Sequence, residues 1–526
     1  MKHLPKQWCW WGLVWLVALG WSRAGAVETL QVQVNPRVEF QTMDGFGASD
    51  AWACQFVGEN WPLAKRERIA DWLFSQELDS GGNPRGIGLS LWRFNITAGT
   101  AEQGKGSDIP DPWRRGECFL QADGHYDWSK QAGQQWFLQA ARQRGVEKFL
   151  AFLNSPPVYF TRNGKGYAPP GITNINLGPG KMEKYSEFMT EVLAHFEQQG
   201  LHFDYLSPFN EPQWSWDDHT QEGTPALNLE EYDLIRYLSR SLSQRGLKTQ
   251  LAIGEAGSIG HAAIRMEDDG RDRQAEFFFQ PDSPFYVGNL PNVAPLISAH
   301  DYQSVWPLNK QVEYRQTLGH ALHTANSKLG YWMSEYCVME QNSETGGGGG
   351  RDLGMNTALF VARLIQNDLM LANAKSWQWW TALSAYDYKD GLIFLDDGAW
   401  GESGRTGADA PGLIKDGVFR ESKLLWALGN FSRFVRPGMA RVQCAVKPTQ
   451  SDANGVMATA FKGGKGRLVV VLVNLSKTET RCTLGGHQTV NVYTTEADTN
   501  LKHSTQNAAQ IELPARSVVT VVKDGR

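Results

Sequence analysis

The feature that most limits the fold of this chain is a regular alternation of short β-rich segments with amphipathic helical segments from Met43 to about Phe431. Such alternation predicts a parallel sheet whose strands are joined by helices. We count eight repeats, the number that closes a (β/α)₈ barrel. The expected strands are Met43–Ala48, Ile87–Asn95, Lys148–Ser155, Phe203–Asn210, Thr249–Glu255, Leu296–Tyr302, Tyr331–Tyr336 and Ser376–Thr381. The helical patterns between them include Pro62–Gln76, Ser129–Arg144, Lys181–Gln199, Leu227–Gln244, Gln311–Ser327 and Met355–Asn373.

After a helix around Lys423–Asn430 the pattern changes to short strands separated by Gly, Asn and Ser turns, which predicts a side antiparallel β-sandwich domain. Its expected strands are Arg441–Val446, Val456–Phe461, Arg467–Leu475, Thr489–Thr494 and Ser517–Val522. Thr29–Phe40 is also strand-like, and we expect it to pair with these strands. The predicted organisation is therefore a signal peptide (1–26), an N-terminal strand joining the side domain (27–42), the barrel (43–432) and the side domain (433–526).

The first residues resemble a secretory signal peptide. Lys2 and Lys6 precede an apolar run, Trp8 to Trp21, that ends at the small residues Ala24-Gly25-Ala26. This run is shorter than the about 20 apolar residues that a membrane-spanning helix needs. The sequence thus predicts a secreted protein, extracellular or periplasmic, that does not insert into a membrane.

Composition excludes several classes of protein. The chain has 51 basic and 56 acidic residues, a formal net charge of −5, which offers no basic footprint for nucleic acid. Cys9 lies in the predicted signal, and the other five cysteines show no CxxC spacing, so neither a disulfide scaffold nor a zinc site is expected. A pairing of Cys444 with Cys482 is a hypothesis, because both fall in the predicted side domain.

Motifs for other chemistries are incomplete. Gly45-Phe46-Gly47 begins like a dinucleotide fingerprint but lacks the third glycine, and the sequence contains no GxxxxGK[ST], HExxH or GxSxG pattern. We therefore expect neither a metal nor another cofactor.

Two glutamates occupy the positions where a barrel enzyme carries its catalytic groups, at the carboxyl ends of strands. Glu211 follows the fourth expected strand in Ser207-Pro208-Phe209-Asn210-Glu211-Pro212, and Glu335 ends the seventh. A retaining glycosidase needs two carboxyls about 5–5.5 Å apart, one protonated and one ionised. The pair therefore predicts this chemistry.

The surroundings of the two glutamates suggest their roles. Trp214 and Trp216 would desolvate Glu211 and favour its protonated form, so we expect Glu211 to be the general acid/base and Glu335 the nucleophile. Arg93, at the end of the second strand, is the expected partner that keeps Glu335 ionised. Glu255 also ends a strand and is the rival, but we expect the fifth strand to lack the geometry that pairs two catalytic carboxyls. Glu340 lies beyond its strand and is a weaker candidate.

Other polar and aromatic residues recur at strand ends, and we expect them to bind a sugar substrate. The chain has 21 Trp, 15 Tyr and 24 Phe, and sugar rings stack on flat aromatic faces. Tyr302 is expected to hydrogen-bond the nucleophile, and Trp380 to form a stacking floor. The complete set of expected substrate-binding residues is Asp50, Trp52, Arg93, Asn154, Asn210, His300, Tyr302 and Trp380.

These stretches resemble glycoside hydrolase family 30, whose members are retaining β-glycanases with a barrel and a side β-domain. The similar stretches are Asp44-Gly45-Phe46-Gly47-Ala48-Ser49, Trp92-Arg93-Phe94-Asn95, Asn154-Ser155-Pro156-Pro157, Ser207 to Pro212, Ser334-Glu335-Tyr336 and Phe431 to Gly438. The resemblance likewise implies that Glu211 is the acid/base and Glu335 the nucleophile.

Within that family, the chain looks most like the endo-β-1,6-galactanase branch. The resemblance rests on Asn154-Ser155-Pro156-Pro157, Thr161-Arg162-Asn163-Gly164 and Glu211-Pro212-Gln213-Trp214. It implies an endo-acting enzyme that cleaves β-1,6-galactan, found as arabinogalactan side chains. A β-1,6-glucanase or a xylanase of the same family stays open, as does a catalytically silent glycan-binding protein. The expected partner is a polysaccharide or oligosaccharide, and the protein is expected to be a monomer.

Overall fold

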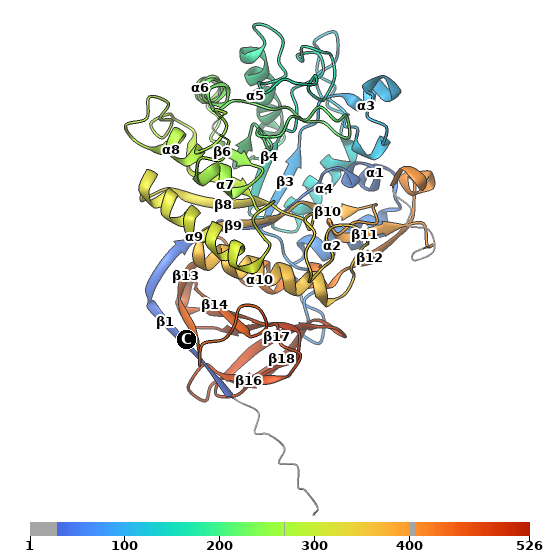
Figure 1. The fold of residues 1–526 in the computed structure, drawn as a ribbon. Helices are drawn as coiled ribbons and strands as arrows, with labels where there is room; N and C mark the ends of the chain where they lie inside the picture. The colour runs from blue at the N-terminus through green and yellow to red at the C-terminus, as the bar shows by residue number, and fades with distance from the viewer. Residues whose placement is uncertain (1–28, 268, 400–406, 526) are drawn as a thin grey trace, which may run out of the picture.

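A computed structural model describes residues 29–267, 269–399 and 407–525. It contains a barrel and a β-sandwich that lies beside the barrel (Figure 1). The predicted signal peptide, residues 1–26, lies outside the described residues.

The barrel is closed by eight parallel strands, which confirms the predicted fold class. Their order around the barrel follows the chain: β2 (Gly45–Ser49), β3 (Leu91–Asn95), β4 (Lys148–Phe152), β5 (Tyr205–Ser207), β6 (Gln250–Ala256), β7 (Val293–His300), β8 (Gly330–Glu335) and β9 (Ala374–Trp379). The fourth strand is much shorter than the predicted Phe203–Asn210. Pro208 follows it directly, and proline has no N–H to donate to a neighbouring strand.

Helices surround the barrel and connect its strands. They are α1 (Ala53–Asn60), α2 (Leu63–Phe74), α3 (Thr100–Gln103), α4 (Ala132–Gln143), α5 (Met182–Gln198), α6 (Asn228–Arg245), α7 (Ile259–Ala263), α8 (Gln274–Phe279), α9 (Leu308–Ala325), α10 (Met355–Leu371) and α11 (Lys423–Ser432). The sequence analysis missed α1, α3, α7 and α8, which are too short to show a clear helical period. It also missed a small sheet of β10 (Thr381–Ser384), β11 (Gly391–Asp396) and β12 (Val418–Glu421), which follows the barrel.

The β-sandwich is built from one strongly curved nine-stranded sheet, in the order β18-β17-β20-β15-β14-β13-β1-β16-β19. The strands are β1 (Thr29–Thr42), β13 (Ala440–Lys447), β14 (Val456–Lys462), β15 (Leu468–Asn474), β16 (Thr480–Thr483), β17 (Thr489–Glu496), β18 (Thr499–Asn507), β19 (Ile511–Leu513) and β20 (Ser517–Lys523). Leu30 and Ile511 from one end of the sheet share a core with Val492 and Val521 from the other. The two ends therefore pack face to face. All pairings are antiparallel except that of β1 with β16.

The barrel interior is layered, and the layers place the polar residues at the open end. Leu91, Leu150, Ala252 and Trp332 form an apolar cluster inside the barrel. Successive side chains of a strand point to opposite faces, so the residue two positions after Leu91 also points inward. That residue is Arg93, which lies one layer nearer the carboxyl ends of the strands.

The five cysteines after the predicted signal peptide are all free, so the hypothesis of a Cys444–Cys482 disulfide is wrong in this structure. The reason is that β1 runs between the two strands concerned. Cys444 lies opposite Val34 of β1, and Cys482 lies opposite Leu30.

We expect alkylation of the denatured, unreduced protein to label all five of these thiols. Mass spectrometry of the intact chain, with and without prior reduction, checks this. If the chain gains more label after reduction than without it, and peptide mapping places the extra label on Cys444 and Cys482, the pair does form.

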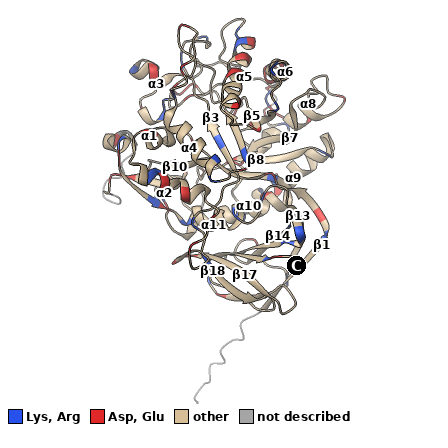
Figure 2. Ribbon diagram, turned by 180° about the vertical axis from the view of Figure 1, so that it is seen from behind, with Lys and Arg blue, Asp and Glu red and all other residues tan. Residues whose placement is uncertain are grey.

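Among the described residues, no helix combines the length and the apolar character that crossing a membrane requires. Figure 2 shows basic and acidic residues interspersed along the helices around the barrel.

Candidate active site

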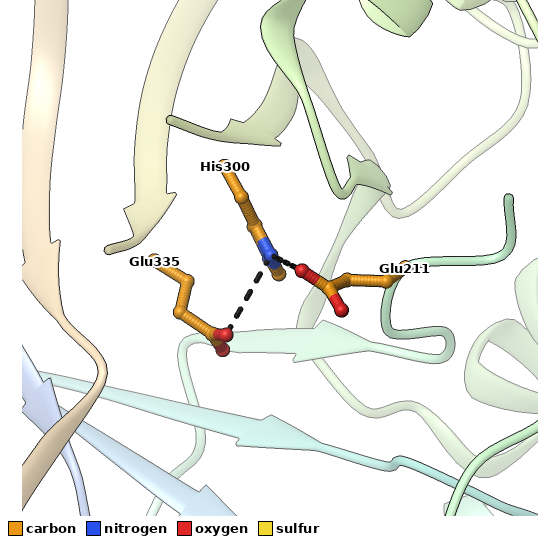
Figure 3. A group of neighbouring side chains, drawn as sticks. All are labelled: Glu211, His300 and Glu335. Carbon is orange, nitrogen blue, oxygen red and sulfur yellow. Dashed lines mark hydrogen bonds and ion pairs between the residues drawn. The ribbon is translucent and has the colours of Figure 1, made fainter. Parts of the chain in front are cut away.

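Glu211 and Glu335 approach each other at the open end of the barrel. Glu335 is the last residue of β8, whereas Glu211 lies in the loop after β5. One carboxylate oxygen of each glutamate and one ring nitrogen of His300 all lie within 4.8 Å of one another (Figure 3). The carboxylates are buried in the protein except for the parts that line one large cleft.

The loop that carries Glu211 has an unusual backbone conformation. Glu211 has φ of 47°, in the left-handed region that residues other than glycine seldom adopt. Its N–H donates to the carbonyl oxygen of Glu255 at 2.9 Å, and its own carbonyl accepts from Trp216 Nε1 at 2.9 Å. Backbone strain of this kind concentrates at functional sites, where the surroundings hold it in place.

His300 lies between the two carboxylates and is fully buried on the side away from the cleft. Its Nδ1 lies 2.9 Å from Glu211 Oε1 and 3.6 Å from Glu335 Oε1, and its Nε2 lies 3.0 Å from Glu255 Oε2. Both ring nitrogens therefore face carboxylate oxygens, which is the arrangement of a doubly protonated imidazole. Burial alone would lower the pKa of His300, but the three carboxylates Glu335, Glu211 and Glu255 raise it to about 10.

Arg93 makes the expected contact with Glu335. Its Nη1 donates to Glu335 Oε2 at 2.9 Å, and its Nη2 donates to Glu255 Oε2 at 3.4 Å. Burial raises the pKa of Glu335 above its ordinary value, and Glu211 adds to that rise, but the charges of His300 and Arg93 oppose it. The two cations thus favour the ionised carboxylate that a nucleophile needs.

Glu255 pairs with both His300 and Arg93, contacts that the sequence analysis did not predict. Burial alone would raise the pKa of Glu255, but the hydrogen bond from His300 and the charge of Arg93 lower it below its ordinary value. Glu255 does not line the cleft. It is a buried counter-ion beneath the site rather than a rival nucleophile.

β-Bulges turn the side chains of Glu255 and Glu335 toward the barrel axis. Leu251 and Ile253 of β6 face the helices, so strict alternation would send Glu255 outward as well. The pairing of β6 with β7 shifts register between Gly254 and Ala256, at Glu255. The pairing of β7 with β8 shifts in the same way and brings Glu335 opposite His300. Bulges are common beside active sites because they redirect side chains.

We expect protonation of His300 to contribute to stability in a pH-dependent way. A folded-state pKa above the ordinary 6.5 stabilises the fold fully below pH 6.5, and this contribution is lost as pH rises to about 10. Across this interval, the melting temperature of the wild type should therefore fall more steeply than that of His300→Gln. A matched control, the exposed His320→Gln on α9, should follow the wild type. Parallel melting curves for the wild type and His300→Gln would contradict this assignment.

The same three side chains, Glu211, His300 and Glu335, are spaced closely enough to hold a metal ion. A metal needs a free lone pair on the imidazole, however, and a nitrogen that carries a proton has none. Because the pKa of His300 is raised to about 10, both nitrogens carry protons at neutral pH. The trio is therefore a poor metal site, and the absence of a cofactor stays a prediction.

The cleft above the carboxylates has a volume of about 1100 Å³. Five of the predicted site residues line it: Asn210, Glu211, Tyr302, Glu335 and Trp380. The Tyr302 hydroxyl donates to Glu335 Oε1 at 3.2 Å, the contact expected from the sequence. Further aromatic rings come from Trp214, Trp216, Tyr386 and Tyr388. The walls thus offer flat apolar faces on which sugar rings can stack.

The other predicted binding residues lie behind this cleft rather than in its wall. Arg93 and His300 are fully buried beneath the carboxylates. Asp50 accepts a hydrogen bond from the Asn95 N–H at 2.8 Å, and burial raises its pKa to about 8. Trp52 packs edge-on against Trp380 at 5.3 Å.

Asn154 also lies outside the cleft wall; it is buried, and neither polar atom of its side chain has a hydrogen-bond partner among the described residues. For all five residues outside the cleft wall, direct contact with substrate stays a prediction; they are Asp50, Trp52, Arg93, Asn154 and His300.

The sequence analysis missed Arg114, which lines the cleft from a short turn between β3 and α4. Its guanidinium lies 5.2 Å from the Trp52 ring and 5.1 Å from the Tyr386 ring, and Nη1 donates to Gln221 Oε1 at 2.9 Å. No strand end marks it, so its only sequence signal is the neighbouring Trp113.

A closed parallel barrel with two neighbouring carboxylates in an aromatic cleft has the features expected of a glycoside hydrolase. Comparison with known families agrees. Residues 29–394 match O-Glycosyl hydrolase family 30, and residues 440–521 match the Glycosyl hydrolase family 30 beta sandwich domain. The chain therefore belongs to glycoside hydrolase family 30, which confirms the resemblance seen in the sequence.

Relatives with known structures or names extend the comparison. The structure of a conserved exported protein from Bacteroides fragilis is 36% identical with a TM-score of 0.88, over 94% of this chain and all of that one. An endo-β-1,6-galactanase of Hypocrea rufa is 24% identical over 88% of this chain and 85% of its own length. Glucuronoxylanase XynC of Bacillus subtilis is 27% identical over 95% of this chain and 93% of its own.

Proposed function

We propose that this family 30 glycoside hydrolase retains the configuration of the cleaved sugar and works by double displacement, with Glu335 as nucleophile and Glu211 as general acid/base. The observation that carries the proposal is the separation of the carboxylates. One carboxylate oxygen of Glu211 lies within 4.8 Å of one carboxylate oxygen of Glu335. Retaining enzymes hold their carboxyl groups about 5–5.5 Å apart, whereas inverting enzymes need about 6.5–9.5 Å to fit a water between them.

The reaction then proceeds in two steps. Glu335 attacks the anomeric carbon while Glu211 gives its proton to the glycosidic oxygen, and the leaving saccharide departs. Glu211, now ionised, takes a proton from water, and this water attacks the same carbon and releases Glu335. Each step inverts the carbon, so the product has the configuration of the substrate.

The residues around the carboxylates support these roles. Arg93 and the protonated His300 place two positive charges beside Glu335 and Glu255. The Tyr302 hydroxyl orients Glu335 from the side of the cleft. Asn210, next to Glu211, has a buried side-chain oxygen with no hydrogen-bond partner in the described part of the chain, and a sugar hydroxyl can donate to it.

We further propose that the substrate is β-1,6-galactan and that the enzyme cleaves within the chain. The Hypocrea rufa relative carries that activity in its name. The cleft, at about 1100 Å³, exceeds the about 300–1,000 Å³ of ordinary small-molecule pockets and has room for several sugar units. Trp214, Trp216 and Tyr388 extend its aromatic lining beyond the carboxylates.

A product profile on β-1,6-galactan, β-1,6-glucan and xylan tests this substrate. We expect oligosaccharides of several lengths from the galactan at early times, and little product from the other two glycans. Preferred cleavage of the glucan or the xylan would replace the galactan assignment but would leave the proposed double-displacement mechanism unchanged. Tight binding of a glycan without any hydrolysis would instead favour a silent binding protein.

We also propose that the protein is exported. Residues 1–26 have the composition of a signal peptide, and the similar Bacteroides fragilis protein is described as exported. N-terminal sequencing of the protein from its native host is expected to start after Ala26. An N-terminus at Met1 would contradict export through this segment.

A further inference from the structure

A second groove lies where the barrel meets the β-sandwich, and it shares no lining residue with the catalytic cleft. One wall comes from α10, which Figure 1 shows between the barrel strands and the sandwich. The opposite wall comes from the loops around Asn454 and Lys477 and from Arg516. Its volume is about 690 Å³, within the range of about 300–1,000 Å³ typical of ligand sites.

Positive charge dominates this groove, although the chain as a whole is acidic. Arg363, Lys477 and Arg516 line it, with Glu344 as the single acidic residue among the lining side chains. Arg516 is held in place because its Nη2 donates to Asn356 Oδ1 at 2.6 Å and its N–H donates to the Ser476 carbonyl at 2.9 Å. The barrel and the sandwich therefore bring basic groups together at one place.

Arg363 has fewer partners than a buried guanidinium usually requires. Its side chain is 1% exposed, and Nη2 donates to Glu344 Oε1 at 2.9 Å. Nε and Nη1 are buried without a hydrogen-bond partner among the described residues. Unmet buried donors are costly, and a bound anion would reduce that cost. Glu344 is 36% exposed, so it can move toward solvent and leave Arg363 to a ligand.

The remaining lining residues suit a sugar rather than a bare anion. Leu359, Phe360 and Leu475 supply apolar surface, while Asn454 and Ser476 supply polar groups. A sugar ring presents apolar C–H faces and hydroxyls together. A carboxylate on that ring matches a guanidinium, which binds carboxylates through two parallel hydrogen bonds.

We propose that this groove binds a carboxylate-bearing sugar unit of a glycan, at a site separate from the catalytic cleft. The inference does not depend on which bond the cleft hydrolyses. A polysaccharide with an acidic unit would then be held at two places on the enzyme, which raises its effective concentration at the cleft.

Titration of the full chain with glucuronic acid, followed by ligand-observed NMR, tests the proposal. Glucose serves as the neutral counterpart, since it has a hydroxymethyl group where glucuronic acid has the carboxylate, and inorganic phosphate serves as a plain anion. We expect saturable binding of glucuronic acid and at least tenfold weaker binding of glucose and phosphate. The double variant Lys477→Gln/Arg516→Gln should weaken glucuronic acid binding at least tenfold, whereas Lys502→Gln, an exposed lysine elsewhere on the sandwich, should not.

Three results would overturn the proposal. Equal binding of glucose would remove the role of the carboxylate, and equal binding of phosphate would remove the role of the sugar. Unchanged binding of glucuronic acid to the double variant would place its site elsewhere. The double variant should hydrolyse a short neutral substrate at the wild-type rate and melt at the wild-type temperature, which separates loss of the groove from loss of the fold.

Discussion

Replacing Glu335 by Gln is expected to lower kcat on the preferred glycan by on the order of 10⁴-fold or more, because the amide cannot attack the anomeric carbon. KM should change far less, since Tyr302, Trp380 and the other walls of the cleft stay in place. Steady-state kinetics on the purified protein measure both constants. No covalent glycosyl-enzyme should be seen by mass spectrometry in this variant.

Glu340→Gln is the matched control for this experiment. Glu340 is half-buried and lines the same cleft, but among the described residues it forms no ion pair with His300 or Arg93. Its kcat should fall by less than about tenfold, the scale of a lost binding contact rather than a lost nucleophile. Full activity in Glu335→Gln together with an inactive Glu340→Gln would transfer the role to Glu340.

The cluster beneath the cleft explains why the two carboxylates can act differently. Three carboxylates, Glu211, Glu255 and Glu335, surround two cations, Arg93 and His300. If all three were ionised, the buried group would carry a net negative charge, which burial disfavours. One proton shared among the three carboxylates balances the charges. Of the three, Glu255 is held ionised by His300 and Arg93. The proposed mechanism places the shared proton on the general acid, Glu211, and leaves the nucleophile, Glu335, beside the two cations.

The sequence was sufficient to predict the barrel and the approach of Glu211 to Glu335 at its open end. Apolar runs that end in polar residues are visible in a single chain, and Tyr331 to Glu335 shows this pattern clearly. Parallel strands in a barrel end at the same face, so two such residues on different strands can be expected to meet. The contacts of Arg93 and Tyr302 with Glu335 followed from the same reasoning.

The role of Glu255 could not be predicted, and the reason is physical. Alternation along β6 directs its side chain toward the helices, and a bulge turns it into the barrel, as another bulge does for Glu335. The position at a strand end marks both residues as candidates, but it does not show which buried charges each of them contacts. A bulge reflects a register between two strands, β6 and β7, and no local pattern records that register. The position of Arg114 in the cleft was missed for a related reason. It lies in a loop that packs against Trp52 and Tyr386, and a loop has no hydrophobic periodicity from which its position could be predicted.

Replacing Glu211 by Ala is expected to affect substrates according to their leaving groups. A sugar leaving group needs a proton, so kcat/KM on the glycan should fall by about 10²–10⁴-fold, the usual contribution of general acid catalysis. A dinitrophenyl glycoside needs no proton to leave, so its kcat/KM should fall by less than about tenfold. Steady-state kinetics on the two substrates give the comparison. Equal losses on both would contradict the acid role.

The second step of the same variant offers an independent check of Glu211. Without a base to activate water, the glycosyl-enzyme on Glu335 should accumulate, and kcat for the dinitrophenyl glycoside should be low. Azide is already a strong nucleophile and needs no base, so added azide should raise kcat and yield a glycosyl azide with the configuration of the substrate. Azide should not accelerate Glu335→Gln, which cannot form the intermediate. An azide product of inverted configuration from Glu211→Ala would mean that azide attacks the substrate directly, and that Glu335 is not the nucleophile.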